Sequence, residues 1–220
     1  MTGVLPGVKY RRGMGETNLS LIDELALLAL REENGRPLIG KMELDCAFAG
    51  ALLAELEIAG RIALVNSLVL LVDQAPVGHD GVDSLLRQIA ADPEPHKPEF
   101  WVRTLQPHHP RTGVLTSLTE QGLVKEQETK ILGLFTLKRY PQISRVPEAE
   151  IRDRMSAAID GQEVPSRVLV LISLVTGCGL ARKLFTLADR PKVRELAKQH
   201  WSGLAVRSVI DMNYTEVAAG

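Results

Sequence analysis

Cys178 is the residue whose setting most suggests nucleophilic chemistry, because its thiol stands between two glycines. A thiol is a good nucleophile only as the thiolate, which needs a nearby base or cation. The five histidines form no HExxH motif, and the chain has neither a nucleophile elbow nor a glycine-rich phosphate loop. The flanking Gly177 and Gly179 are explained more simply by close helix packing around a small buried residue. The sequence therefore predicts a non-enzymatic protein without catalytic residues, and an enzyme that uses Cys178 is a distant alternative.

Metal, cofactor and disulfide chemistry are not expected either. Cys46 and Cys178 lie far apart and lack any metal-ligand spacing. The adjacent His108 and His109 are flanked by prolines on a predicted loop without an acidic partner nearby in the sequence. The longest apolar stretch, residues 168–180, is shorter than the roughly 20 residues that cross a bilayer. We expect a cytoplasmic protein, with attachment to the inner face of the membrane as an option.

The charge is nearly balanced, at −1, but it is unevenly distributed, since acidic residues prevail in residues 1–110 and basic residues afterwards. The C-terminal region carries a basic group made up of Arg182, Lys183, Arg190, Lys192, Arg194, Lys198 and Arg207. A nucleic-acid interpretation would assign this group to phosphates. However, Trp201 and Tyr214 alone could offer stacking platforms there. Solvated helical charge is the preferred interpretation, and nucleic acid is not the expected partner.

Apolar residues at helical spacing, together with capping and stop residues, predict a mainly helical chain. The first helix begins near Thr17, Asn18 or Ser20. The predicted ranges are about 20–33, 43–59, 81–91, 99–105, 111–121, 148–159, 166–187 with a break at 177–179, and 191–212. Small residues between Ala47 and Ala54 would let other helices approach closely, so residues 43–59 are predicted to form the central helix.

Two short β-hairpins are predicted between the helices. The first joins residues 61–65 and 68–72 through Asn66 and Ser67, and the second joins residues 123–127 and 130–135 around Glu128 and Thr129. Each hairpin follows a helix and a glycine, an order that resembles a winged-helix unit. The predicted fold is therefore a mainly α single domain over residues 19–214 with two small hairpins, preceded by a flexible basic arm over residues 1–18.

A series of motifs extends over nearly all of residues 19–212. The motifs are Leu-Ile-Asp-Glu-Leu-Ala-Leu-Leu-Ala-Leu from Leu21, Ala-Gly-Ala-Leu-Leu-Ala-Glu-Leu from Ala49 followed by Gly60-Arg-Ile, Asp73-Gln-Ala-Pro-Val-Gly, Gly133-Leu-Phe with Arg139-Tyr-Pro, and Leu169-Val-Leu-Ile-Ser-Leu-Val with Gly179-Leu. In this order and spacing they resemble the Golgi phosphoprotein 3 family, particularly its shorter bacterial members. Eukaryotic members of that family are mostly helical and bind phosphatidylinositol 4-phosphate on Golgi membranes.

The resemblance implies a non-enzymatic peripheral membrane or adaptor module in a bacterium, whose partner is a phosphoinositide or another anionic phospholipid head group on a membrane surface. The alternative is a winged-helix-like module that has kept the family fold for protein interaction or nucleic-acid binding, without lipid activity. Salt-dependent retention on DNA would favour that alternative.

The family's head-group pocket uses a tryptophan, an arginine on the central helix, and two arginines before the second hairpin. The corresponding positions here are Gly40, Ala49, His108 and Arg111, so only Arg111 keeps the family's residue type. Lys41 and the two histidines lie near these positions and are expected to replace part of the missing charge, with stronger binding in mildly acidic solution. The predicted head-group residues are Arg111, His108 and Lys41.

Two further segments are expected to help attachment. The arm, with Arg11 and Arg12, would interact with anionic lipid, although a solvated tail explains these charges at least as well. The second hairpin, as in the family, would insert into the membrane or pair between subunits. Its apolar residues are Ile131, Leu132, Leu134 and Phe135. An ordinary buried wing is an equally good explanation of this hairpin.

Overall fold

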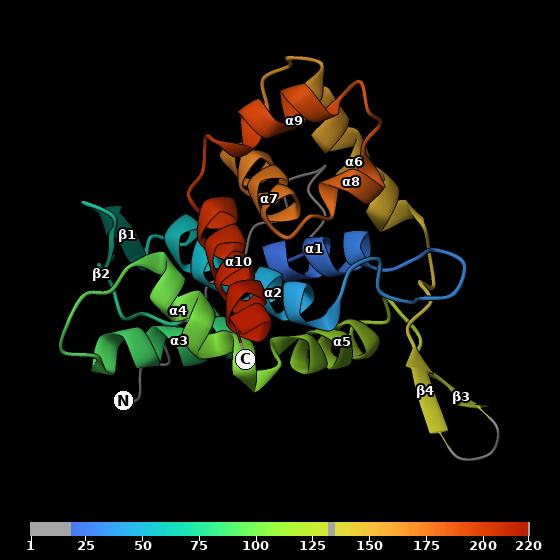
Figure 1. Ribbon diagram of the computed structural model, residues 1–220, viewed down its shortest axis with the longest axis horizontal. Helices are drawn as coiled ribbons and strands as arrows, with labels where there is room; N and C mark the ends of the chain where they lie inside the picture. The colour runs from blue at the N-terminus through green and yellow to red at the C-terminus, as the bar shows by residue number, and fades with distance from the viewer. Residues whose placement is uncertain (1–18, 132–134, 220) are drawn as a thin grey trace, which may run out of the picture.

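The computed structural model describes residues 19–131 and 135–219 (Figure 1). The predicted basic arm with Arg11 and Arg12, and the hairpin residues Leu132 and Leu134, lie outside the described residues. Ile131 ends one strand of the second hairpin and Phe135 begins the other.

The described part of the chain folds into ten α-helices, one short 3-10 helix and two antiparallel hairpins, which confirms the predicted fold class. In chain order the elements are α1 (Leu21–Ala29), α2 (Lys41–Ile58), β1 (Ile62–Val65), β2 (Leu68–Leu71), α3 (Asp80–Ala91), α4 (Pro98–Leu105), η1 (Gln106–His108), α5 (Pro110–Glu120), β3 (Gln127–Ile131), β4 (Phe135–Arg139), α6 (Val146–Ile159), α7 (Ser166–Gly177), α8 (Ala181–Leu184), α9 (Arg190–Ala197) and α10 (Ser202–Ala219).

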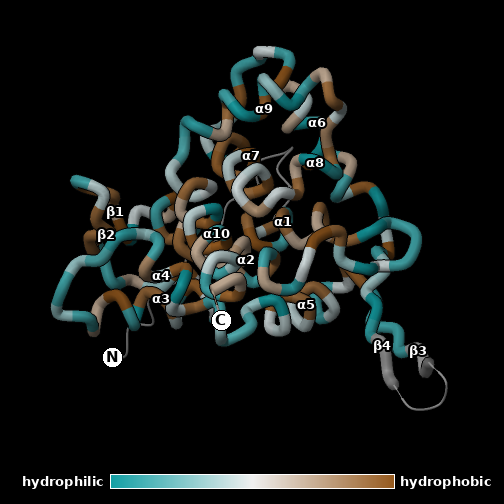
Figure 2. The backbone as a smooth tube through the Cα atoms, in the orientation of Figure 1, coloured by the Kyte–Doolittle hydropathy of each residue, from teal (hydrophilic) through white to brown (hydrophobic). Residues whose placement is uncertain are grey.

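Helix α2 is the central helix, as predicted, and packs against α1, α3, α4, α5, α7 and α10 (Figure 1). Its residues from Leu44 to Ala54 are all buried, most of them small or apolar. A Cβ atom added at Gly50 would collide with Val206 of α10 and press on Leu174 of α7. Apolar segments accordingly gather on the inner helices in Figure 2. Small side chains on α2 therefore set how closely its neighbours approach.

The first helix is shorter than predicted. Ser20 is its N-cap and forms a reciprocal capping box with Asp23, which selects Ser20 among the three candidates. The predicted end near residue 33 was wrong, because α1 stops at Ala29. Leu30 instead bridges Pro37, and the N–H of Leu38 donates to the carbonyl of Ala29 at 2.8 Å. The carbonyl of Ala29 thus accepts from Leu38 and not from a further turn of helix.

Both hairpins follow helices that end on a left-handed glycine, Gly60 (φ 68°) after α2 and Gly122 (φ 70°) after α5. In the first hairpin, Asn66 and Ser67 have φ of 51° and 62° and form the predicted two-residue turn. In the second, the predicted turn at Glu128 was wrong. Residues 127–131 pair with residues 135–139, so Glu128 and Thr129 lie within β3 and not in a turn. Glu-Thr lacks the turn chemistry that a tight hairpin needs.

The predicted helix over residues 191–212 was also wrong in one respect, because it is divided into α9 and α10. The division is stabilised by Glu57 near the end of α2. Its carboxylate lies 2.9 Å from Nε2 of His200 and accepts a 2.7 Å hydrogen bond from Nε1 of Trp201. These partners are distant in the sequence, so helical periodicity alone does not reveal the break.

Helices α7 and α10 cross at glycines. Added Cβ atoms at Gly177 and Gly203 would overlap the backbone of the opposite helix, at Gly203 and Ser173 respectively. The hydroxyl of Ser173 also accepts a 3.0 Å hydrogen bond from the N–H of Gly203 and donates to the carbonyl of His200 at 2.8 Å. The predicted close packing at Gly177 is thus confirmed. Gly179 has a different role, because it turns the chain with φ of 81°.

We expect Gly203→Ala to lower the free energy of unfolding by about 1–3 kcal/mol, since the added methyl group must force the crossing apart. The matched control is Gly113→Ala on α5, where an added Cβ meets nothing within 4 Å. This control should be neutral or stabilising by up to about 1 kcal/mol. Urea unfolding of both variants checks the difference, and a Gly203→Ala variant as stable as the parent would contradict the close crossing.

Candidate functional site

The structure brings the three predicted head-group residues to one end of α2. Lys41 is the first residue of α2, His108 ends η1, and Arg111 lies in the first turn of α5. Nη1 of Arg111 reaches the carbonyl oxygen of Lys41 at 3.5 Å, and η1 packs against α2. Lys41 and His108 are exposed. Residues far apart in the sequence thus form one cationic corner of the molecule, here called the α2–α5 corner.

A buried carboxylate lies beneath this corner. Asp45 of α2 is 1% exposed and forms an ion pair with the guanidinium of Arg111. Its other oxygen accepts a 3.2 Å hydrogen bond from the backbone N–H of Arg111, and Nδ1 of His109 lies 3.2 Å from the carboxylate. His109 has φ of 50°, a left-handed turn immediately before Pro110. Asp45 was not predicted as an acidic partner of the histidine pair, because it lies 64 residues from His109 in the sequence.

The other two positions that the family resemblance predicted for the pocket, Gly40 and Ala49, carry no cationic side chain. Gly40 is the N-cap of α2, and Ala49 is fully buried in the core. Near Gly40, the Glu43 carboxylate accepts a hydrogen bond from the hydroxyl of Tyr214. That hydrogen bond raises the pKa of Tyr214 above its usual range, because the neighbouring carboxylate disfavours the phenolate. The α2–α5 corner therefore combines the exposed side chains of Lys41 and His108 with an arginine that is already paired.

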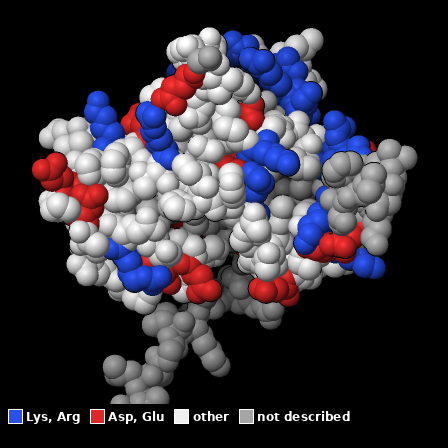
Figure 3. All heavy atoms as spheres, turned by 60° about the horizontal axis from the view of Figure 1, so that its bottom comes forward, with Lys and Arg blue, Asp and Glu red and all other residues white. Residues whose placement is uncertain are grey.

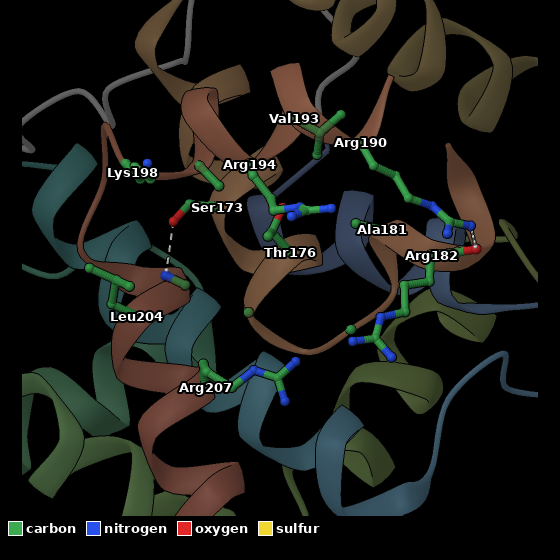
Figure 4. A pocket seen from close by; sticks show the side chains of 14 residues that line it. Ser173, Thr176, Ala181, Arg182, Arg190, Val193, Arg194, Lys198, Leu204 and Arg207 are labelled. Atoms are coloured by element: carbon green, nitrogen blue, oxygen red, sulfur yellow. Dashed lines mark hydrogen bonds between the residues drawn. The ribbon is translucent and has the colours of Figure 1, made fainter. Parts of the chain in front are cut away.

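A second feature is a cavity of ≈ 480 Å³ among α7, α8, α9 and α10 (Figure 4). Five basic side chains line it, and no Asp or Glu does: Arg182, Arg190, Arg194, Lys198 and Arg207. The sequence analysis interpreted these residues as solvated helical charge. The fold instead gathers five of the seven members of that basic group around one space. Figure 3, which shows one face of the molecule, mixes both signs of charge, with Lys and Arg densest toward its upper margin.

Cys178 lies in the turn after α7 and is 3% exposed. Its Sγ donates to the carbonyl of Val175 at 3.6 Å. Burial raises the pKa of the Cys178 thiol to about 12. Burial, with the nearby carboxylate of Asp45 as a second cause, likewise raises the pKa of Cys46 to about 12. Both groups are therefore thiols rather than thiolates near neutral pH.

In residues 19–131 and 135–219, no group of three or more His, Cys, Asp or Glu side chains is arranged so that it could hold a metal ion. No helix in those ranges has both the length and the apolar character needed to span a bilayer.

We expect Arg111→Ala to destabilise the fold by about 1–3 kcal/mol, because Asp45 is left buried without its charged partner. Combining it with Asp45→Asn should recover part of the loss, since the uncompensated charge is then gone. The control is Lys198→Ala, which breaks the exposed 2.7 Å pair with Glu195 and should change stability by less than about 1 kcal/mol. Chemical unfolding of the four proteins checks this, and a cost of Arg111→Ala no larger than the control's would contradict it.

Both cysteines should resist a thiol-specific reagent such as dithionitrobenzoate at pH 8 in the folded protein. Their pKa values of about 12 and their burial keep the thiolate scarce and inaccessible. Two equivalents should react rapidly in denaturant. Stoichiometric labelling of Cys178 before unfolding would contradict this expectation and would revive the enzymatic alternative.

Comparison with protein families agrees with the order of motifs and with the helical fold. The model of the family described as Golgi phosphoprotein 3 (GPP34) matches residues 21–212, which span α1 to the middle of α10. The chain therefore belongs to the Golgi phosphoprotein 3 family.

Proposed function

We propose that this protein is a non-enzymatic peripheral membrane module that binds anionic phospholipid head groups from the cytoplasmic side, with phosphoinositides such as phosphatidylinositol 4-phosphate as the preferred class. One observation carries the proposal. In this member of the family, Arg111 lies at one expected head-group position and Lys41 lies beside another. The two residues meet at the α2–α5 corner, where the guanidinium of Arg111 reaches the backbone carbonyl of Lys41.

The geometry supports a particular division of roles. Arg111 is held by the Asp45 carboxylate, so it offers a positioned donor with little net charge. Lys41 is exposed and supplies a charge that no ion pair uses within the described fold, and the exposed His108 supplies a further hydrogen-bonding side chain. Each exposed charge pair contributes about 0–1 kcal/mol. Binding through this corner should therefore be modest and should weaken as salt rises.

Two other segments are part of the proposal. The hairpin β3–β4 stands away from the helical body (Figure 1), in a position from which it could touch a membrane or a second copy of the chain. At its base, Lys138 pairs with Glu126 at 2.7 Å. The arm, with Arg11 and Arg12, would add nonspecific attraction to anionic lipid. These roles rest on the family and on the prominence of the hairpin.

Co-sedimentation with vesicles tests the proposal. Phosphatidylcholine vesicles are compared with vesicles that also contain phosphatidylserine or phosphatidylinositol 4-phosphate, at low and physiological salt. We expect binding to the anionic vesicles, and we expect Lys41→Gln with His108→Gln to weaken it by about threefold to tenfold, the effect of losing up to two exposed charge contacts. The matched control is Arg87→Gln, which removes one exposed charge from α3.

If Arg87→Gln weakens vesicle binding as much as the double variant does, the effect is one of net charge. That result would contradict a role of the α2–α5 corner. Absence of binding to every vesicle would overturn the proposed function. In that case salt-dependent retention on DNA would favour the alternative, a winged-helix-like module without lipid activity.

A further inference from the structure

The cavity among α7, α8, α9 and α10 has the features of an anion site. It is large enough for a small ligand, since pockets that hold such ligands measure about 300–1,000 Å³, and this cavity measures ≈ 480 Å³. Ser173 and the glycine crossing of α7 and α10 form part of its lining. Gly177 and Gly203 of this crossing therefore share the cavity lining with basic side chains.

Two of these side chains have no anionic partner among the residues that the structure describes. Arg182 on α8 and Arg194 on α9 are exposed, and neither guanidinium forms an ion pair or hydrogen bond within the described fold. Figure 4 shows their guanidinium groups around the same space as that of Arg207, so three different helices present positive charge to one place. Like charges held together in this way are unfavourable until an anion joins them.

The remaining cations are only partly neutralised. Nη1 of Arg207 lies 3.3 Å from Asp211, and Nζ of Lys198 lies 2.7 Å from Glu195, in exposed pairs. Arg190 is positioned differently, because its guanidinium donates to the carbonyl of Arg182 at 3.0 Å and so ties α9 to α8. No carboxylate of either acidic partner lines the cavity. An entering anion would therefore meet donors rather than competing acids.

We propose that this cavity binds a phosphomonoester, with the phosphate held by Arg182, Arg194 and Arg207. Guanidinium groups match the oxygen geometry of phosphate and bind it in a bidentate manner. The apolar side chains of Val193 and Leu204 line the same cavity and leave room for the group that the phosphate esterifies. This proposal goes beyond the proposed function and does not rest on it, because the α2–α5 corner contributes no residue to the cavity.

The turn at Gly179 belongs to this site. Its φ of 81° allows the chain to bend between α7 and α8, and a Cβ added there would lie 4.0 Å from Nη2 of Arg207. The left-handed turn thus brings α8, with Arg182, to the side of the cavity opposite α10. Gly179 is therefore assigned a role in positioning α8 beside the cavity, which the sequence alone did not indicate.

Calorimetric titration tests the proposal with two soluble probes, inorganic phosphate and glycerol 3-phosphate, against sodium chloride at equal ionic strength. We expect saturable binding of the phosphates but not of chloride. Arg182→Gln with Arg194→Gln should weaken it by at least about tenfold, the effect of losing one charge-assisted hydrogen bond or more. Lys192→Gln, which removes a charge from α9 outside the cavity lining, should have little effect.

Vesicles of phosphatidylcholine with phosphatidic acid identify the source of the phosphate. If they bind the parent protein, lose affinity for the Arg182 and Arg194 variant, and are displaced by glycerol 3-phosphate, the ligand is a lipid head group. If only the soluble probes bind through these arginines, the ligand is a soluble phosphate ester. The proposal is overturned if no phosphate compound binds better than chloride, or if the double variant and the Lys192 control bind equally well.

Discussion

The rest of the structure depends on how closely helices can approach α2. Six helices pack against it, and its buried face includes four alanines, Ala47, Ala49, Ala51 and Ala54, with Gly50 at the point where Val206 of α10 and Leu174 of α7 converge. A larger side chain at Gly50 would push α10 outward. Because an interior is close-packed, such a displacement could not be confined to one contact. The arrangement of the remaining helices follows from this small-residue surface.

The acidic residues of α2 hold neighbouring helices in place through hydrogen bonds and ion pairs. Asp45 holds α5 through Arg111, and Glu55 accepts a 2.8 Å hydrogen bond from the N–H of Leu21 in α1 and pairs with Arg167 of α7. Glu57 holds the segment between α9 and α10. Asp45 is buried, and a buried charge must be paired where it lies. One helix therefore positions both the α2–α5 corner and one wall of the basic cavity.

In this protein, the fold and the distribution of charge on it are separate properties. The fold over residues 21–212 is that of the Golgi phosphoprotein 3 family, because packing constrains α2 and its neighbours. The charges on the surface are less constrained by this packing. Ala49 is buried, Arg111 is paired with Asp45, and five basic side chains gather around α7 to α10. A fold can be retained while the distribution of charge on it changes.

The sequence by itself determined the elements and the family. Periodicity and turn residues located the helices, the Asn66-Ser67 hairpin and the small-residue central helix, because these depend on local backbone preference and on which face is apolar. Tertiary structure alone decided the rest. The break before α10 depends on Glu57, a partner distant in the sequence, and the early end of α1 depends on the turn that pairs Leu30 with Pro37. Likewise, no local pattern shows that Asp45 neutralises Arg111 or that Arg182, Arg194 and Arg207 share one cavity, because helix packing alone brings these side chains together.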